Sequence, residues 1–268
     1  LDLTEGIPSH DTFNAVFACL KPSEFEACLV RWVQALHQES QGAILNIDGK
    51  TLRGSKKAKG NCQAVHVVSC WAEANHLSLG SVVVEEKSNE IPAIPKLLEL
   101  IEIQGALVTI DAMGCQKEIA KTIVEKEADY VLQVKDNQRG LKNAIEDCVE
   151  QHVETDFADI PHREYVTHEK GHGREEHRTY LVLEAPEDFS ETSKWEKLKA
   201  LGVVMNEIKR EGQLTYSIRY YILSRYLEAE LFAKAVRGHW SIENNLHWQL
   251  DVTFHEDQLR IGKHQAPV

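Results

Sequence analysis

Residues 44–50, ILNIDGK, form an apolar stretch with the character of a strand, and a carboxylate, Asp48, stands near its end. Residues 106–111, ALVTID, repeat this arrangement and end in Asp111. A carboxylate beside apolar strand residues needs a partner, because an unpaired charge is costly to bury. Carboxyl ends of strands are also where α/β proteins commonly place their sites. Either aspartate alone is more often a cap or a loop residue, but two on core strands favour a shared site.

The segments around these two stretches predict a mixed α/β sheet with helical crossovers. Strands joined through helices run parallel, whereas strands joined by tight turns can be antiparallel. The resulting order, βββαβαβ, is that of a ribonuclease-H-like core, although periodicity by itself indicates only the α/β class. The expected elements are strands over 43–48, 64–72 and 76–85, a helix from about 88 to 101, a strand over 106–110, a helix over 116–126 and a strand over 130–134.

The remaining segments predict helices at both ends and a β-rich insertion between them. Ser9, Asp11 and Pro22 are candidate starts of two N-terminal helices, whose apolar spacing predicts packing on a neighbour. After a helix over 141–148, strands are expected over 163–169, 174–183, 201–208 and 216–223, and closing helices over 228–236 and 240–250, separated by a break at Gly238. The expected organisation is an N-terminal helical segment (1–40), a first core part (41–140), a β-rich insertion (141–225) and a closing helical part (226–268).

Composition limits the class of protein. The 268 residues are 43% hydrophobic and 27% charged, which suffices for a substantial core. No apolar run reaches the ~18 residues of a membrane span and the start does not look like a signal peptide, so we expect a cytoplasmic protein with no membrane partner. The six cysteines include no CxxC pair, so most are expected to be reduced and buried.

The formal charge of −12 counts against binding to a polyanion. That charge is uneven, however, because residues 50–59 are locally basic while acidic residues crowd the segments 97–102, 146–159 and 184–196. The chain also begins without Met and stops at Val268, so we expect a fragment of a longer protein whose other parts carry positive charge. A basic groove on an acidic body is therefore compatible with this composition.

Carboxylate ligands of this kind suit Mg²⁺ or Mn²⁺. Two such ions ~4 Å apart can stabilise the attacking and leaving oxygens of a phosphodiester displacement, and a third carboxylate would complete the site. The candidate is Glu243, because His239, Glu243 and His247 recur every four residues and form one polar stripe on a helix. An amphipathic surface helix explains the same stripe without any site.

Several cations and amides stand close in sequence to the two aspartates and could grip DNA phosphates, although a solvated surface is an equal alternative for each: Lys50, Arg53, Lys135, Asn137 and Gln138. Residues 167–178 contain three histidines that could suggest a metal site. Loosely spaced, exposed histidines rarely bind zinc alone, so a hairpin that presents Arg174 and Arg178 to DNA is preferred.

Six motifs resemble the H-repeat-associated (ISAs-type) insertion-sequence transposases, and they occur in order from about residue 7 to the end of the chain. They are residues 47–53 (IDGKTLR), 86–95 (EKSNEIPAIP), 109–116 (TIDAMGCQ), 134–138 (VKDNQ), 171–176 (GHGREE) and 239–252 (HWSIENNLHWQLDV). Several motifs are long, so a chance similarity is improbable.

The resemblance implies a ribonuclease-H-like DDE catalytic domain with a β-strand insertion before the glutamate helix. Asp48, Asp111 and Glu243 would then hold two Mg²⁺ or Mn²⁺ ions. Water would release a 3′-hydroxyl at the element end, and that hydroxyl would attack target DNA. The implied partners are double-stranded DNA, as terminal inverted repeats and target, and a second copy of the chain in a homodimer on DNA.

One departure concerns the helix of Glu243. Many related transposases carry Tyr, Arg and Lys around this glutamate, whereas the places four before and seven after it are His239 and Leu250 here. His239, Asn244 and His247 are the substitutes expected to contact DNA. Two alternatives remain open at this point, namely a DNA-binding remnant that no longer transposes and a metal-dependent nuclease of the same fold.

Overall fold

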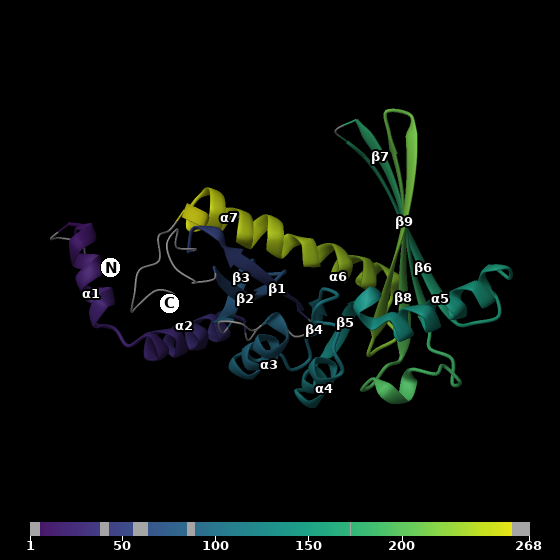
Figure 1. Ribbon diagram of the computed structural model, residues 1–268, viewed down its shortest axis with the longest axis horizontal. Helices are drawn as coiled ribbons and strands as arrows, with labels where there is room; N and C mark the ends of the chain where they lie inside the picture. The colour runs from purple at the N-terminus through teal and green to yellow at the C-terminus, as the bar shows by residue number, and fades with distance from the viewer. Residues whose placement is uncertain (1–5, 38–42, 56–63, 85–88, 172, 259–268) are drawn as a thin grey trace.

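A sheet of nine strands runs through the molecule in the order β3-β2-β1-β4-β5-β9-β8-β7-β6 (Figure 1). The structure, a computed structural model, describes residues 6–37, 43–55, 64–84, 89–171 and 173–258. The strands are β1 (Ile44–Leu52), β2 (Val65–Ala72), β3 (Leu77–Val83), β4 (Leu107–Ile110), β5 (Asp129–Val134), β6 (His162–Gly171), β7 (Arg174–Glu184), β8 (Ala200–Arg210) and β9 (Gln213–Leu223).

The helices connect and cover these strands. They are α1 (His10–Cys19), α2 (Pro22–His37), α3 (Glu90–Leu100), α4 (Lys117–Glu125), α5 (Arg139–Val153), α6 (Ala229–Ser241) and α7 (Trp248–Val252), with a π-helical segment, Ile242–His247, between α6 and α7. None of the helices in the described ranges is long and apolar enough to cross a membrane.

The first five strands confirm the ribonuclease-H-like order expected from the sequence. β1 pairs antiparallel with β2, and β2 pairs antiparallel with β3. β1, β4 and β5 run parallel, because α3 and α4 lie in the connections between them. The fold is therefore a mixed α/β sheet with helical crossovers.

Two layers of helix cover this part of the sheet on opposite faces (Figure 1). Alternate residues of a strand point to opposite faces, and β4 is buried throughout. Val108 and Ile110 join the core cluster that contains residues of α3 and α4. Leu107 joins the second cluster, which contains Phe232 and Val236 of α6. Odd-numbered residues of β4 therefore face α6.

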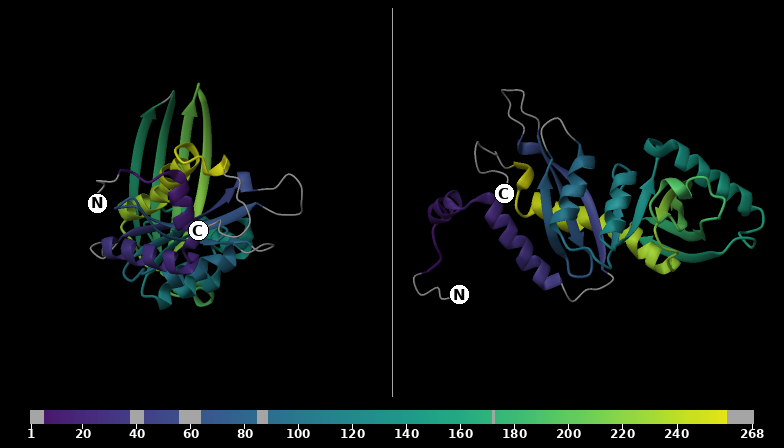
Figure 2. Two further views of the ribbon diagram at one scale, coloured as in Figure 1. Left: turned by 90° about the vertical axis from the view of Figure 1, so that its left-hand side faces the viewer. Right: turned by 90° about the horizontal axis from the view of Figure 1, so that it is seen from below.

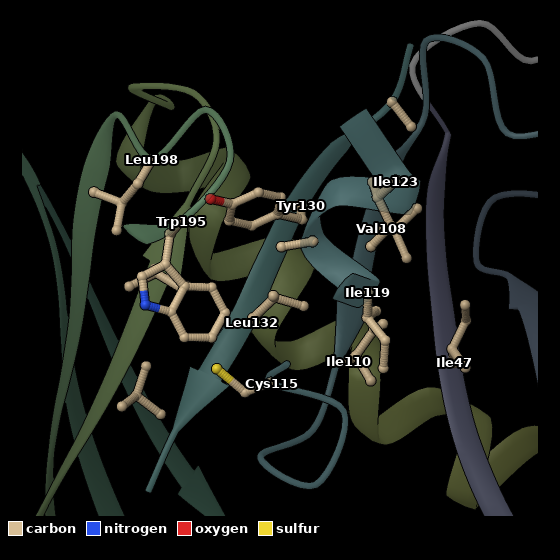
Figure 3. Close-up of a cluster of buried hydrophobic side chains, with 14 of the residues drawn as sticks. Ile47, Val108, Ile110, Cys115, Ile119, Ile123, Tyr130, Leu132, Trp195 and Leu198 are labelled. Carbon is tan, nitrogen blue, oxygen red and sulfur yellow. The ribbon is translucent and has the colours of Figure 1, made fainter. Parts of the chain in front are cut away.

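The predicted β-rich insertion continues the same sheet, since β9 pairs with β5. Only the last residues of β9 take part in this pairing, from Tyr220 to Leu223. The other ends of β6–β9 rise beyond the helices (Figure 2), and the first six residues of β9 are exposed. Tyr130, Trp195 and Leu198 are buried where β5 meets the connection before β8 (Figure 3). This cluster anchors the projecting strands to the core.

Three expectations need correction. Ser9 caps α1 as predicted, and Phe17 contacts Phe25 of α2, with ring centroids 5.7 Å apart, but no residue of α1 is buried, so the expected packing is slight. Gly238 does not break the last helix, because α6 continues through it to Ser241. Of the described cysteines, Cys70, Cys115 and Cys148 are buried, whereas Cys19 and Cys28 are exposed.

Cys62, His172 and the basic residues 56–59 lie outside the described residues.

Candidate active site

Asp48 and Asp111 lie side by side because their strands are paired in parallel. The last registered pair of β1 and β4 is Ile47 with Ile110. Asp48 directly follows Ile47, and Asp111 directly follows Ile110. The preceding pair, Asn46 with Thr109, belongs to the face that α6 covers, and Asp48 and Asp111 repeat that parity. Both carboxylates therefore stand at one edge of the sheet, on the side of the predicted glutamate helix.

The environment of Asp48 is unfavourable for a lone charge. Its side chain is 17% exposed. Burial, together with the negative charges of Asp111, Glu90 and Glu243, raises the pKa of Asp48 from 3.8 to about 7, although a backbone hydrogen bond from Gly49 lowers it. The four carboxylates therefore act on one another electrostatically. A divalent cation would relieve this repulsion.

Asp111 is held by the loop that follows it. Its Oδ1 accepts hydrogen bonds from the backbone N–H groups of Met113 (3.0 Å) and Gly114 (3.3 Å). A Cβ on Gly114 would collide with the side chain of Ile110, so this tight loop needs glycine. The result is a fixed carboxylate at the carboxyl end of β4.

Glu243 lies at the start of the π-helical segment and is exposed. A π-helical turn within an α-helix changes the direction of the side chains that follow, and such turns are frequent at functional sites. Among the described residues, no three His, Cys, Asp or Glu side chains form a group that could hold a metal ion in this arrangement. The three carboxylates share one edge of the molecule, but they would have to turn toward one another to share a ligand.

The polar side chains of the helix that carries Glu243 lie in different environments. The ring of His239 lies against β4, with Nδ1 3.1 Å from Oγ1 of Thr109, and burial lowers its pKa. Nδ1 of His247 lies 3.6 Å from Oδ2 of Asp48. Burial, reinforced by the charge of Lys50, lowers the pKa of His247 to about 4, so this imidazole is neutral at pH 7. Asn244 is exposed.

Lys50 forms ion pairs with two carboxylates that follow Glu243 in the sequence, and it does not face solvent. Its Nζ lies 2.6 Å from both Asp251 and Glu256, and its side chain is 10% exposed. Burial lowers the pKa of Lys50, but the two carboxylates outweigh burial and raise it. The backbone N–H of Arg53 donates to Oδ1 of Asp257 (3.0 Å). The segment after Glu243 is thus fastened to the strand of Asp48.

The family follows from sequence comparison. The transposase DDE domain family matches residues 39–266 of this chain. The chain belongs to this family. The "H repeat-associated putative transposase YhhI" of Escherichia coli (strain K12) is 40% identical over 272 residues, which cover 99% of this chain and 71% of the relative. "Putative transposase YncI" of Escherichia coli O157:H7 is 42% identical over 269 residues, covering 99% and 68%.

The resemblance to H-repeat-associated transposases is thereby confirmed. Among solved structures, the piggyBac transposase synaptic complex with hairpin DNA is 13% identical, with a TM-score of 0.41 over 94% of this chain and 52% of that one. At such a score the fold assignment depends on the strand order, which independently gives the ribonuclease-H-like arrangement expected of a DDE domain.

The residues expected to contact DNA near the candidate site differ in how accessible their side chains are. Arg53, 87% exposed, and Lys135 are open to solvent. Nδ2 of Asn137 instead donates to the carbonyl of Ala112 (2.6 Å), and Nε2 of Gln138 donates to the carbonyl of Cys115 (2.9 Å). These two amides support the loop of Asp111, and their contact with DNA stays a prediction.

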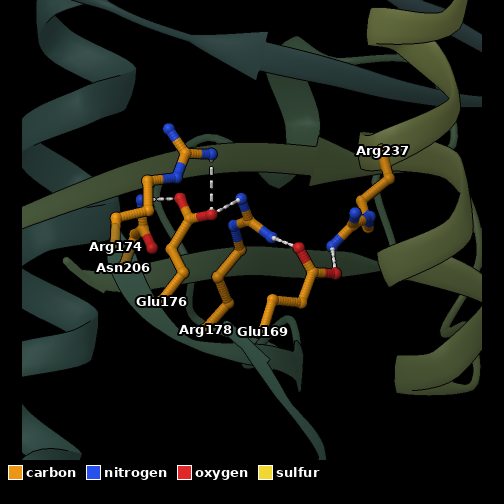
Figure 4. Close-up of polar contacts among 6 residues, drawn as sticks. All are labelled: Glu169, Arg174, Glu176, Arg178, Asn206 and Arg237. Atoms are coloured by element: carbon orange, nitrogen blue, oxygen red, sulfur yellow. Dashed lines mark hydrogen bonds and ion pairs between the residues drawn. The ribbon is translucent and has the colours of Figure 1, made fainter. Parts of the chain in front are cut away.

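Arg174 and Arg178 do lie in a β6–β7 hairpin, but they belong to an ion-pair network there (Figure 4). Arg178 lies 2.6 Å from Glu176 and 3.2 Å from Glu169, and it is 18% exposed. Arg174 lies 3.0 Å from Glu176 and is 52% exposed. The guanidinium of Arg178 therefore points at carboxylates within the sheet, whereas that of Arg174 has an open side.

Several polar residues near the two aspartates have no role predicted from the sequence. Nε2 of His66 lies 2.6 Å from Glu90, and its Nδ1 lies 2.8 Å from Oγ1 of Thr51. The pair fits only because Gly49 has no side chain, since a Cβ there would collide with Glu90. Asn46 and Thr109 are also buried at polar positions inside apolar strands. That polarity was the available signal, because a buried polar group needs a partner.

Proposed function

We propose that this transposase-family chain cuts DNA at the ends of an insertion sequence and joins the freed ends to target DNA. The observation that carries the proposal is the parallel pairing that sets Asp48 beside Asp111, on the sheet face covered by the helix that leads to Glu243. The raised pKa of Asp48 supports it, because a partly buried carboxylate that is repelled by other carboxylates favours a bound cation. Family membership supports the same reaction class.

Asp48, Asp111 and Glu243 would hold divalent ions, and their carboxylate oxygens fit Mg²⁺ or Mn²⁺. When bound, two such ions stabilise the attacking and leaving oxygens of an in-line displacement. Water attacks first and frees a 3′-hydroxyl, and that hydroxyl then attacks target DNA. The backbone N–H groups of Met113 and Gly114 keep the Asp111 carboxylate oriented through both displacements.

Double-stranded DNA is the proposed partner, both as terminal inverted repeats and as target. Joining requires two element ends to meet, so we propose a homodimer on DNA. Of the residues expected to contact phosphates, Arg53, Lys135 and Asn244 are exposed around the site and are the first candidates. Arg174, at the exposed hairpin, is a more distant candidate.

Asp111→Asn tests the proposal. We expect the rate of Mg²⁺-dependent nicking at element ends to fall by about 1,000-fold, which corresponds to a loss of roughly 4 kcal/mol of transition-state stabilisation. Asp147→Asn, the same change on the exposed side of α5, is the control and should cleave like the unmodified chain.

Nicking that survived Asp111→Asn would overturn the assignment of the site. Nicked product without joined product from the unmodified chain would favour a nuclease. Binding to terminal repeats with neither product would favour a DNA-binding remnant. The assay therefore measures nicked DNA, joined DNA and bound DNA on the same substrate.

A further inference from the structure

A network of buried and partly buried polar side chains lies one step behind the three carboxylates. Asn46 and Thr109 each stand two residues before an aspartate, and His239 stands four residues before the glutamate. Asn46 and Thr109 are registered partners on β1 and β4, and they are 0% and 3% exposed. Asn46, Thr109 and His239 therefore lie on β1, β4 and α6, the three elements that lead to the carboxylates.

Hydrogen bonds connect this inner set without a gap. Oγ1 of Thr109 donates to Oδ1 of Asn46 (2.7 Å), and Nδ1 of His239 lies 3.1 Å from the same Oγ1. On the other side, Nδ2 of Asn46 donates to Oε2 of Glu73 over a longer distance of 3.5 Å. Ser241 also donates its hydroxyl proton to Oε2 of Glu73.

The direction of each hydrogen bond in this network follows from the contacts of its donors and acceptors. The Thr109 hydroxyl has a single proton, which goes to Asn46. Nδ1 of His239 must therefore carry a proton and donate it to Thr109, which fixes the tautomer of a neutral imidazole. Every donor then points along the chain toward the carboxylate of Glu73. His239 and Ser241 are both on α6, so the series of hydrogen bonds begins and ends on the helix that leads to Glu243.

Apolar contacts alone would fix α6 less well. Packed apolar residues tolerate small shifts along a helix axis, whereas a buried hydrogen-bond chain loses its partners when the helix moves. Helix α6 is thus attached at His239 and at Ser241, immediately before the π-helical segment.

We propose that Asn46, Thr109, His239 and Glu73 form a positioning network that sets Glu243 against Asp48 and Asp111 for DNA cleavage. The inference rests on the proposed transposase function and gives His239 a role different from the DNA contact expected from its sequence position. It also explains why polar residues occupy buried places in two apolar strands.

Thr109→Val removes the central hydroxyl and keeps the shape of the side chain. We expect the single-turnover nicking rate, at saturating DNA and metal and well below the thermal midpoint, to fall about 10- to 100-fold, because small misplacements of catalytic groups cost that much. The apparent Kd for DNA should stay within about twofold. Thr109→Ser, which keeps the hydroxyl, should restore the rate.

Thr167→Val is the matched control. The Thr167 hydroxyl is also buried but has no hydrogen-bond partner among the described residues, so its loss should leave the rate unchanged. A Thr109→Val chain that cleaves at the unmodified rate would overturn the proposal. So would a loss confined to DNA affinity, which would return His239 to a DNA-contact role, or an equal loss in Thr167→Val.

Hydrogen exchange of the backbone amides of residues 238–248 gives a readout that does not depend on cleavage. Thr109→Val should lower protection there by about tenfold or more, Thr109→Ser should restore it, and Thr167→Val should not change it. If the unmodified chain failed to cleave DNA, the proposed function would fall while this measurement still decided the positioning role. Unchanged protection in Thr109→Val would refute the network.

Discussion

The two halves of the nine-stranded sheet handle charge in different ways. In the aspartate half, β3-β2-β1-β4-β5, helices cover both faces, and the most buried polar side chains, Asn46 and Thr109, are neutral and hydrogen-bonded to each other, whereas the partly buried Asp48 stands among other carboxylates. In the projecting half, β9-β8-β7-β6, the most buried carboxylate, Glu176, is 5% exposed and lies between Arg174 and Arg178 (Figure 4).

This difference separates structural charges from reactive ones. A buried carboxylate with arginine partners is stabilised in its ionised form, whereas one surrounded by other carboxylates is destabilised. Glu176 and Glu169 therefore hold the projecting strands together. Asp48 is left with an unfavourable charge that a ligand can neutralise.

The largest expected effect on stability comes from Asp48→Asn in the absence of divalent metal. The folded chain holds the Asp48 proton up to pH about 7, while the unfolded chain releases it near 3.8. Stability from this group is therefore present below pH 4 and is lost as the pH rises to 7, by roughly 4 kcal/mol, the free-energy equivalent of this difference in pKa. The asparagine variant should lack this loss.

Thermal unfolding from pH 4 to 8 measures that difference. The variant should be more stable than the unmodified chain at pH 8, and the advantage should shrink toward pH 4. Millimolar Mg²⁺ or Mn²⁺ should stabilise only the unmodified chain. Parallel pH profiles for the two chains would contradict the comparison, and Asp147→Asn, an exposed site, should follow the unmodified chain.

Lys50→Met probes the ion pairs that attach the segment after Glu243 to β1. The change leaves Asp251 and Glu256 facing each other at a partly buried site, so we expect a loss of about 2 to 3 kcal/mol, below the range for fully buried pairs. Adding Asp251→Asn and Glu256→Gln should recover most of the loss. Weaker DNA binding with an unchanged thermal midpoint would instead support the phosphate contact expected from the sequence.

Much of the aspartate half could be predicted because its signals are local. Strand and helix periodicity gave the order of elements, and the carboxylates that end two apolar stretches gave Asp48 and Asp111. Their common face follows from strand parity once the parallel register of β1 and β4 is known. Asn46 and Thr109 carried the same kind of signal, a polar residue in an apolar strand, and their partners lie on distant elements.

Long-range contacts were not predictable from local pattern. The pairing of Val131 with Leu223 joins the two halves of the sheet, and no residue near either strand indicates it. The partners of Lys50 lie about 200 residues away, so a clamped lysine looked like a phosphate contact. Gly238 weakens a helix in isolation, but α6 is packed so that Gly238 is buried, and this tertiary packing overrides that propensity. The π-helical segment has no periodic signature.

The smallest expected effect comes from the projecting half. Arg178→Met leaves Glu176 with Arg174 at 3.0 Å and with Nδ2 of Asn206 at 3.5 Å, so we expect about 2 kcal/mol of destabilisation rather than the full cost of an unpaired charge. Arg237→Met removes the ion pair with Glu169, where both side chains are nearly half exposed, and should cost only about 0.5 kcal/mol.

Urea unfolding of both variants measures this order, and Arg178→Met combined with Glu176→Gln should recover most of the larger loss. Arg178 is also a predicted DNA contact, and that role requires its guanidinium to leave Glu176 and Glu169. A variant that binds element ends more weakly at unchanged stability would show that the guanidinium is available to DNA. Reduced stability with unchanged binding would show that charge in the projecting half is structural, in contrast to the repelling carboxylates around Asp48.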